Sequence, residues 1–483
     1  MLVLLRLFAL SALFALPLLA QVTPPVPGSH AITVEIEGYE EDLLTLGYYL
    51  LDNQYIVDTA YRNAEDAFVF ASDTAALPKG IYIVVLAPDN EYFQLLVGDD
   101  ADQEFSLRTK MGQLSQMTVA GSEENELFYQ YLGFLDGMQK EGGPLREQLS
   151  DSTATEQERT AARSRLEELD KQVKAYQQQL IDERPDAFVS AIIEANRPAL
   201  PPDFAEAADE DSRRELQWRW LQEHYFDGLN LKDERLLRTP FLFERIDYYV
   251  NTLQVRHPDT LGQAIDKVLA QFDPLSEAFK FYTVHFTNEA AGSNIVGMDA
   301  LYVYLVDHYY RAGKAYWSDD EQLAKMTETT DRIRPLLIGK TAPDLKMTTR
   351  GGEPITLYDV DADYTVLYFW RYDCPACKKS TPHMKDFYTK WKDRGVKIFS
   401  VCTKGADELG KCWEYVDENE TGDWVQVADP YQRYYKAYDI KSTPTIFLLD
   451  KDKQIVSKRI GAEQLDEVLT NLEKSKSAAA AGK

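Results

Sequence analysis

Cysteine and basic residues are scarce in this chain, and each shortage excludes a class of protein. Only 4 of the 483 residues are cysteine, too few for a small fold held together mainly by disulfide bonds. Lysine and arginine number 52 against 79 aspartate and glutamate residues, which gives a net charge of −27. That charge argues against binding to nucleic acid or to an anionic membrane surface, because both partners are negatively charged.

Patterns typical of metal, phosphate and serine chemistry are missing as well. The histidines of the middle region are dispersed and have no cysteine near them, so we expect no zinc or di-iron site. These histidines are His224, His257, His285 and His308. The chain has no glycine-rich phosphate loop and no Gly-x-Ser-x-Gly elbow, so we expect neither a metal nor an organic cofactor.

A long apolar run occurs only at the N-terminus. Leu7 to Ala20 is a largely apolar run of 14 residues after Arg6, which is short for a membrane span but suits a secretory signal peptide. We predict that residues 1–20 are such a signal, with an uncleaved anchor as the alternative. No other segment is long enough, so we expect no stable membrane span after cleavage. The expected location is the periplasm or cell envelope, where disulfides form.

Residues 30–120 are predicted to be rich in β-strands. Short segments with strand patterns are separated by turn signals such as Pro78-Lys79-Gly80, which favours a small antiparallel sandwich or barrel. The expected strands are Ala31–Ile36, Gln54–Asp58, Ala67–Phe70, Ile81–Leu86, Tyr92–Val97 and Glu104–Leu107.

Residues 121–335 are predicted to be α-helical. Thr155 with Glu158 is typical of a capping box, and the apolar seam that follows predicts one arm of a helical hairpin. Gly142-Gly143-Pro144 is expected to interrupt the preceding helix. The many aromatic residues further on fit a buried core, although an exposed aromatic face that docks a partner is an alternative. They are Trp218, Trp220, Tyr248, Tyr249, Tyr302, Tyr304, Tyr309 and Tyr310.

The C-terminal third differs in composition from the rest of the chain. Residues 336–483 carry 23 basic and 23 acidic residues, so the first 335 residues account for the whole net charge of −27. All four cysteines, Cys374, Cys377, Cys402 and Cys412, lie in this neutral part. We therefore expect a separate module here, followed by a low-complexity flexible tail over residues 475–483.

The Cys374-Pro375-Ala376-Cys377 sequence stands between a predicted strand and a predicted helix. The apolar run Thr365–Trp370 is typical of a buried strand, and a helical pattern follows Cys377. Cys374 would then lie at a helix N-terminus, where backbone amides and the helix dipole lower a thiol pKa. Cys377, one turn later, could attack a mixed disulfide formed at Cys374, as thiol–disulfide exchange requires.

The C-terminal module resembles the thioredoxin-like domain of secreted proteins of the TlpA/ResA type. The matching features are Gly339, Ala342-Pro343-Asp344, Phe369-Trp370, Cys374 to Cys377, Pro382, Asp429 and Thr443-Pro444. The resemblance implies an α/β thioredoxin-like fold over residues 336–474, with Cys374 as attacking thiol and Cys377 as resolving thiol. It also implies a substrate groove with Pro444 as its cis-proline, beside Thr443 and Trp370.

The two positions where such domains usually hold a proton acceptor depart from the family pattern. Tyr368 stands where thioredoxins have a buried aspartate, and Ser380 stands where ResA-type proteins have a glutamate. The route by which Cys377 loses its proton is therefore open. Asp373 is a candidate for proton transfer, or instead a negative charge that raises the pKa of Cys374.

Cys402 and Cys412 are ten residues apart and allow several states. A structural disulfide, two buried free thiols and a second redox-active pair all remain possible from the sequence.

These observations predict an exported thiol–disulfide oxidoreductase built from a β-rich sandwich, an α-helical domain and a thioredoxin-like domain. Its expected partners are protein thiols or disulfides and an upstream electron donor. The β-rich and helical parts more loosely resemble domains of unknown function that precede such modules in exported bacterial proteins. The alternatives are a binding or scaffold protein with an inert thioredoxin module, and a peroxiredoxin-like peroxidase. The latter is disfavoured because Arg371 stands where such enzymes place a threonine.

Overall fold

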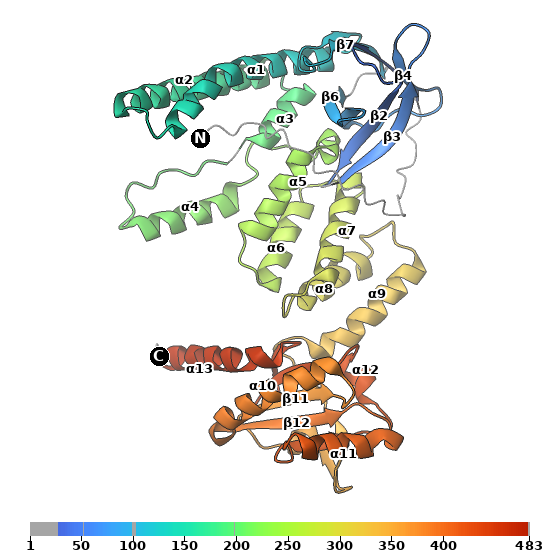
Figure 1. Ribbon diagram of the computed structural model, residues 1–483, viewed down its shortest axis with the longest axis vertical. Helices are drawn as coiled ribbons and strands as arrows, with labels where there is room; N and C mark the ends of the chain where they lie inside the picture. The colour runs from blue at the N-terminus through green and yellow to red at the C-terminus, as the bar shows by residue number, and fades with distance from the viewer. Residues whose placement is uncertain (1–27, 52, 99–102, 198, 482–483) are drawn as a thin grey trace. The chain divides into compact units, whose positions relative to one another are not determined.

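The computed structural model describes residues 28–51, 53–98, 103–197 and 199–481. They divide into two compact units (Figure 1): one holds the described residues up to Gln254 with Ala270–Ala278, and the other holds Val255–Leu269 with the residues from Phe279 onward. The predicted signal peptide, residues 1–20, lies outside the described residues. Within the described ranges, no helix has the length and apolar character needed to cross a membrane.

Eight strands of the first unit form two four-stranded sheets. Their orders are β4-β1-β7-β8 and β3-β2-β5-β6. The strands are β1 (His30–Glu37), β2 (Leu43–Leu50), β3 (Asn53–Tyr61), β4 (Phe68–Ser72), β5 (Gly80–Leu86), β6 (Glu91–Val97), β7 (Gln103–Lys110) and β8 (Thr118–Ala120). All six predicted strands are confirmed, and β2 and β8 are additional.

The purely antiparallel arrangement expected for this region is wrong for one pair of strands. β1 and β7 run parallel, with His30 opposite Gln103. A parallel pair needs a long connection, and here five other strands lie between β1 and β7 in the chain. β2 was not predicted, because its pairing with β3 shifts register between Leu46 and Gly47. The shift breaks the regular alternation of apolar residues along the strand.

Strand β5 is buried on both of its faces, unlike β1, whose side chains alternate between buried and half-buried. The short helix η1 (Glu234–Arg238) packs against it. A Cβ atom at Gly80 would lie 2.3 Å from the Cβ of Arg238, so this close approach requires glycine.

The predicted helical hairpin is present as α1 (Glu123–Ser150) and α2 (Glu156–Glu183), which lie side by side in Figure 1. The capping box of Thr155 and Glu158 begins α2, and the Phe134 and Tyr176 rings stack with centroids 4.1 Å apart. The expected interruption at Gly142-Gly143-Pro144 is wrong, because α1 continues through it. A Cβ at Gly142 would lie 3.5 Å from the Leu166 side chain of α2, an ordinary packing distance, so this position faces the partner helix.

The remaining helices of the middle region bury only part of the aromatic set. They are α3 (Phe188–Asn196), α4 (Glu210–His224), α5 (Pro240–Asp247), α6 (Pro258–Leu269), α7 (Glu277–Gly292), α8 (Asp299–Leu305) and α9 (Asp320–Ile333). Tyr249, Tyr309 and Tyr310 are buried, as a core role predicts, whereas Trp218 and Tyr248 are exposed.

The thioredoxin-like domain is a seven-stranded sheet covered by helices on both faces. Its strand order is β10-β9-β13-β12-β11-β14-β15. The strands are β9 (Lys346–Thr349), β10 (Pro354–Thr356), β11 (Tyr364–Trp370), β12 (Val396–Cys402), β13 (Val425–Ala428), β14 (Thr445–Asp450) and β15 (Ile455–Lys458). The helices are α10 (Pro375–Trp391), α11 (Leu409–Glu418), α12 (Tyr434–Tyr438) and α13 (Leu465–Ala481).

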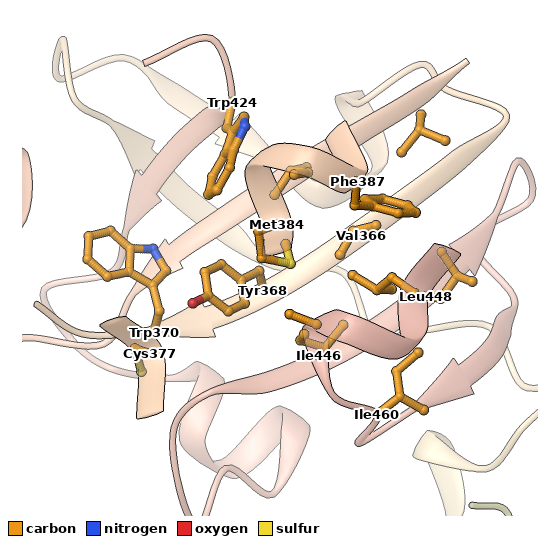
Figure 2. Packing of buried hydrophobic residues seen from close by; sticks show 14 of the residues in the cluster. Val366, Tyr368, Trp370, Cys377, Met384, Phe387, Trp424, Ile446, Leu448 and Ile460 are labelled. Atoms are coloured by element: carbon orange, nitrogen blue, oxygen red, sulfur yellow. The ribbon is translucent and has the colours of Figure 1, made fainter. Parts of the chain in front are cut away.

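Strand β11 lies in the centre of the sheet, and each of its residues is buried. Val366, Tyr368 and Trp370 belong to one core cluster, whereas Leu367 and Phe369 belong to another. We call these the first and second core clusters. Figure 2 shows Met384 and Phe387 of α10 packed over the first cluster. The alternation along β11 therefore assigns its side chains to opposite faces of the sheet.

Helix α13 runs through most of residues 475–483, the segment predicted as a flexible tail. The alanines before Gly482 explain the extension, because alanine has the highest helix propensity.

Two ion pairs join the thioredoxin-like domain to helices α8 and α9 within the second unit. The Lys458 ammonium group contacts Asp299 and donates to the Leu336 carbonyl oxygen. Arg332 lies 2.7 Å from Asp439. The Lys458 side chain is only 4% exposed, so its charge depends on these partners.

Candidate functional site

The two cysteines of the Cys-Pro-Ala-Cys sequence lie where β11 leads into α10. β11 ends at Trp370 and α10 begins at Pro375, so Cys374 caps the helix. Its sulfur accepts a hydrogen bond from the backbone amide of Cys377 at 3.1 Å. Proline suits the first helical position because the amide it lacks would have no partner within the helix. The Cys374 sulfur therefore lies at the positive end of the helix dipole.

The pKa values of the two thiols shift in opposite directions. Burial works to raise the pKa of Cys374, but interactions with the side chains of Cys377 and Thr443 and with the backbone amide of Cys377 outweigh it and hold the pKa below the ordinary thiol value. Burial is the main cause that raises the pKa of Cys377 to about 12, and its interaction with Cys374 adds to the shift. Near neutral pH, Cys374 is therefore the better source of thiolate, while Cys377 remains a thiol.

The alkylation rate of Cys374 should rise with pH and reach half of its maximum below pH 9.0, the ordinary thiol value. The thiolate is the nucleophile, so lowering the pH through the Cys374 pKa should reduce the rate by about tenfold per pH unit. Iodoacetamide labelling of the reduced chain across a pH series, with peptide mass spectrometry, measures both cysteines at once. A midpoint for Cys374 above 9.0, or faster labelling of Cys377, would contradict this assignment.

The loop before β14 contacts the Cys374 sulfur. The Thr443–Pro444 peptide bond is cis, and the Cys374 thiol donates a hydrogen bond to the Thr443 carbonyl oxygen at 3.2 Å. Trp370 is buried in the first core cluster with both cysteines, and its indole N–H donates to the Ser400 hydroxyl at 2.7 Å. The structure thus brings Thr443 and Pro444 to the dithiol and places Trp370 in the core beside it.

Asp373 belongs to a network of ion pairs beside the dithiol. Its carboxylate lies 2.9 Å from Lys404 and 3.3 Å from Arg371. Partial burial works to raise the pKa of Asp373, but the bond to Lys404 outweighs it and the pKa is lowered. These contacts tie the turn before α10 to the loop after β12. An ionised carboxylate engaged by two cations is a poor proton acceptor near neutral pH.

Ser380, at the position of the family glutamate, bonds within its own helix. Its hydroxyl donates to the Ala376 carbonyl oxygen at 3.0 Å.

Cys402 and Cys412 form a disulfide that ties the end of β12 to α11. Both residues are fully buried and belong to the first core cluster with Cys374 and Cys377. Cys402 pairs with Trp370 across the sheet. The disulfide therefore holds α11 beside the last residue of the strand that leads to the dithiol.

Replacing both Cys402 and Cys412 with alanine should lower the free energy of unfolding by about 2–3 kcal/mol, the amount expected for a cross-link over so short a loop. Urea denaturation followed by tryptophan fluorescence measures the loss, and Cys374 alkylation checks that the dithiol remains reactive. If the variant lost exchange activity at unchanged stability, a redox role for this pair would replace the structural one.

Three residues with hydroxyl groups lie near the dithiol, and the sequence predicts no role for them: Thr381, Tyr415 and Tyr368. The Thr381 hydroxyl donates to the Cys377 carbonyl oxygen at 3.0 Å and lies 2.9 Å from the Tyr415 hydroxyl. The Tyr415 ring lies over Trp370, with centroids 5.3 Å apart. Tyr368 was noted only as a departure from the family pattern. Tyr415 could be suspected from its position one turn after Cys412, but no local pattern relates it to Cys377.

The residues available to bind a metal are spread apart. Across the described ranges, no group of three or more His, Cys, Asp or Glu residues is placed to hold a metal ion.

Comparisons with known proteins relate the C-terminal part of the chain to redox proteins. Residues 338–458 match the AhpC/TSA family. The thiol-disulfide oxidoreductase ResA of Bacillus thuringiensis (strain Al Hakam) is 33% identical over 138 residues, which make up 28% of this chain and 78% of ResA. Protein DipZ of Mycobacterium bovis is 29% identical over 144 residues, which make up 26% of this chain and 20% of DipZ.

A solved structure described as a domain of a possible thiol-disulfide isomerase from Cytophaga hutchinsonii is also similar. It has 38% sequence identity and a TM-score of 0.28, and the match covers 30% of this chain and 98% of that one. The segment that matches the AhpC/TSA family contains both cysteines of the dithiol and the Thr443–Pro444 bond.

Proposed function

Because the chain belongs to the ResA family of thiol-disulfide oxidoreductases, we propose that its Cys374–Cys377 dithiol reduces disulfides of partner proteins. The observation that carries this proposal is the difference between the two thiols. Cys374 caps helix α10 and has a lowered pKa, whereas Cys377 is fully buried and has a raised pKa. Cys374 is thus suited to attack a disulfide as a thiolate, and Cys377 stays protonated until the mixed disulfide forms. Thiol–disulfide exchange by a dithiol requires this difference.

The proposed reaction has two steps. The Cys374 thiolate attacks one sulfur of the partner disulfide, a bond forms between them, and the partner's other sulfur leaves as a thiolate that takes up a proton. Cys377 then loses its proton and attacks the Cys374 sulfur, which releases the partner's first sulfur as a thiolate. The dithiol loses two electrons and the partner gains them, so an upstream electron donor must reduce the Cys374–Cys377 disulfide again.

The proposed location is the periplasm or cell envelope. The largely apolar run from Leu7 to Ala20 suits export as a signal peptide. The Cys402–Cys412 disulfide supports the same location, because disulfides form and persist in oxidising compartments.

The reduction potential of the Cys374–Cys377 pair tests the proposed direction. It is measured by alkylation in defined redox buffers, with mass spectrometry to separate this pair from Cys402 and Cys412. A potential near about −270 mV, as in thioredoxin, supports a reductase. A potential near about −120 mV, as in a strong periplasmic oxidant, would make the chain a disulfide donor instead.

The titration and a peroxidase assay test the other two candidate functions. A pair that cannot be titrated would point to a binding or scaffold protein with an inert thioredoxin module. Consumption of hydrogen peroxide by the reduced chain, lost when Cys374 is replaced, would favour a peroxidase.

A further inference from the structure

The core around Cys377 contains a phenol that makes no formed hydrogen bond within the described part of the chain. Tyr368 is 1% exposed, and its hydroxyl oxygen finds no partner among the described residues. It belongs to the first core cluster together with Cys377. Figure 2 shows its hydroxyl directed toward the end of β11, where Trp370 and Cys377 lie. A buried hydroxyl without a partner is costly, so a function that uses it in another state of the site would explain why it is there.

Two other hydroxyls, those of Thr381 and Tyr415, lie near the backbone carbonyl of Cys377. Thr381 donates to the Cys377 carbonyl oxygen, so its oxygen can only accept the hydrogen of Tyr415. Tyr415 is half-buried and comes from α11, the helix that the Cys402–Cys412 disulfide anchors. These contacts fix the first turn of α10. The Thr381 hydroxyl also lies close enough to Tyr368 to act against the rise in that phenol's pKa, but no formed hydrogen bond joins the two side chains.

The buried members of the first core cluster are apolar residues, aromatics and cysteines. The nearby carboxylate of Asp373 is occupied by Lys404 and Arg371. Burial raises the pKa of Tyr368, and its interaction with Cys377 adds to that shift. The phenol therefore stays protonated and can donate a hydrogen bond, but it cannot accept a proton from the thiol.

We propose that Tyr368 donates a hydrogen bond to the Cys377 sulfur when Cys377 becomes a thiolate and resolves the mixed disulfide. This inference rests on the proposed function and assigns the resolving step a partner in place of the family carboxylate. Cys377 releases its proton to solvent, and its sulfur bonds to that of Cys374. The partner's sulfur leaves with the electron pair of the broken bond and takes up a proton. Tyr368 keeps its own proton throughout. Its hydrogen bond stabilises the buried negative charge of the Cys377 thiolate until the new disulfide bond forms.

The resolving step can be measured separately with 5,5′-dithiobis(2-nitrobenzoate) under single-turnover conditions. Cys374 attacks first and releases one nitrothiobenzoate, and Cys377 then releases the second. In the full chain, Tyr368→Phe removes only the hydroxyl. It should slow the second release by about tenfold, the loss expected for one hydrogen bond to a charged group. The first release should be unchanged, because Cys374 depends on other donors.

A matched control is Tyr434→Phe, which removes another fully buried hydroxyl that lacks a partner among the described residues. Tyr434 belongs to the second core cluster, with Leu367 and Phe369, so both releases should keep their rates. A second test uses Tyr415→Phe, which should slow the second release less than Tyr368→Phe does.

The outcomes separate this inference from the proposed function. Equal second-release rates in the wild type and Tyr368→Phe would overturn the inference and leave the reductase intact. Equal slowing of both releases, or similar slowing by Tyr434→Phe, would also overturn it, because the effect would then be structural. A wild-type chain that releases no nitrothiobenzoate would refute the proposed function itself.

Discussion

Replacing Cys374 with serine should lower the rate at which the chain reduces a disulfide by at least about a thousandfold. The remaining thiol, Cys377, is fully buried and its pKa is raised to about 12. At neutral pH only a minute fraction of it is thiolate, whereas the lowered pKa of Cys374 gives a much larger fraction. The capping amide of Cys377 would then face a serine hydroxyl, which is not a nucleophile under these conditions.

The matched variant is Cys377→Ser, which removes the resolving thiol and keeps the attacking one. It should react once with a disulfide probe and remain as a mixed disulfide at Cys374, visible as a mass increase. Turnover of insulin disulfides and intact mass spectrometry measure the two variants side by side. If Cys374→Ser formed the mixed disulfide and Cys377→Ser did not, the roles of the two cysteines would be reversed.

Replacing Lys458 with methionine should lower the free energy of unfolding by about 3 kcal/mol, because it breaks a buried ion pair by removing one partner. The Lys458 side chain is 4% exposed and that of Asp299 is 20% exposed. The other carboxylate oxygen of Asp299 is already buried without a hydrogen-bond partner in the described part of the chain. Loss of the ammonium group would therefore leave a partly buried charge and the Leu336 carbonyl without their main partner.

Urea denaturation of the full chain measures this effect. The control is Lys110→Met, which breaks the exposed pair with Glu37 and should change stability by less than about 1 kcal/mol. The double variant Lys458→Met with Asp299→Leu should recover most of the loss, because an apolar pair can replace a buried ion pair. Equal effects of Lys458→Met and Lys110→Met would show that the buried pair contributes no more than a surface pair.

The elements that could be predicted are those with local causes. The apolar run before Trp370 predicts β11, and Thr155 with Glu158 predicts the start of α2. β2 could not be predicted in this way, because its bulge breaks the alternation. The continuation of α1 through Gly142-Gly143-Pro144 could not be predicted either, because these residues usually end a helix, and α1 instead continues along its partner α2.

The candidate site likewise has parts that local sequence predicts and parts that depend on contacts between distant residues. The spacing of Cys374 and Cys377, with the strand before them and the helix after them, is enough to place a thiol at a helix N-terminus. The contact between Thr381 and Tyr415 joins residues 34 positions apart, and the carbonyl of Thr443 reaches Cys374 across 69 positions. No pattern in neighbouring residues encodes either contact.

The sequence by itself determined the dithiol and the order of attack expected at a helix N-terminus, because both depend on residues within a few positions of one another. The thioredoxin-like module could be predicted as well, because its motifs occur in a recognisable order from Gly339 to Pro444. The tertiary structure decided that Cys402 is bonded to Cys412, that Asp373 is engaged by Lys404, and that Tyr368 keeps an unpaired hydroxyl in the core with Cys377. Burial and long-range contacts set these properties, since the free energy of a charge or a hydroxyl depends on what surrounds it after folding.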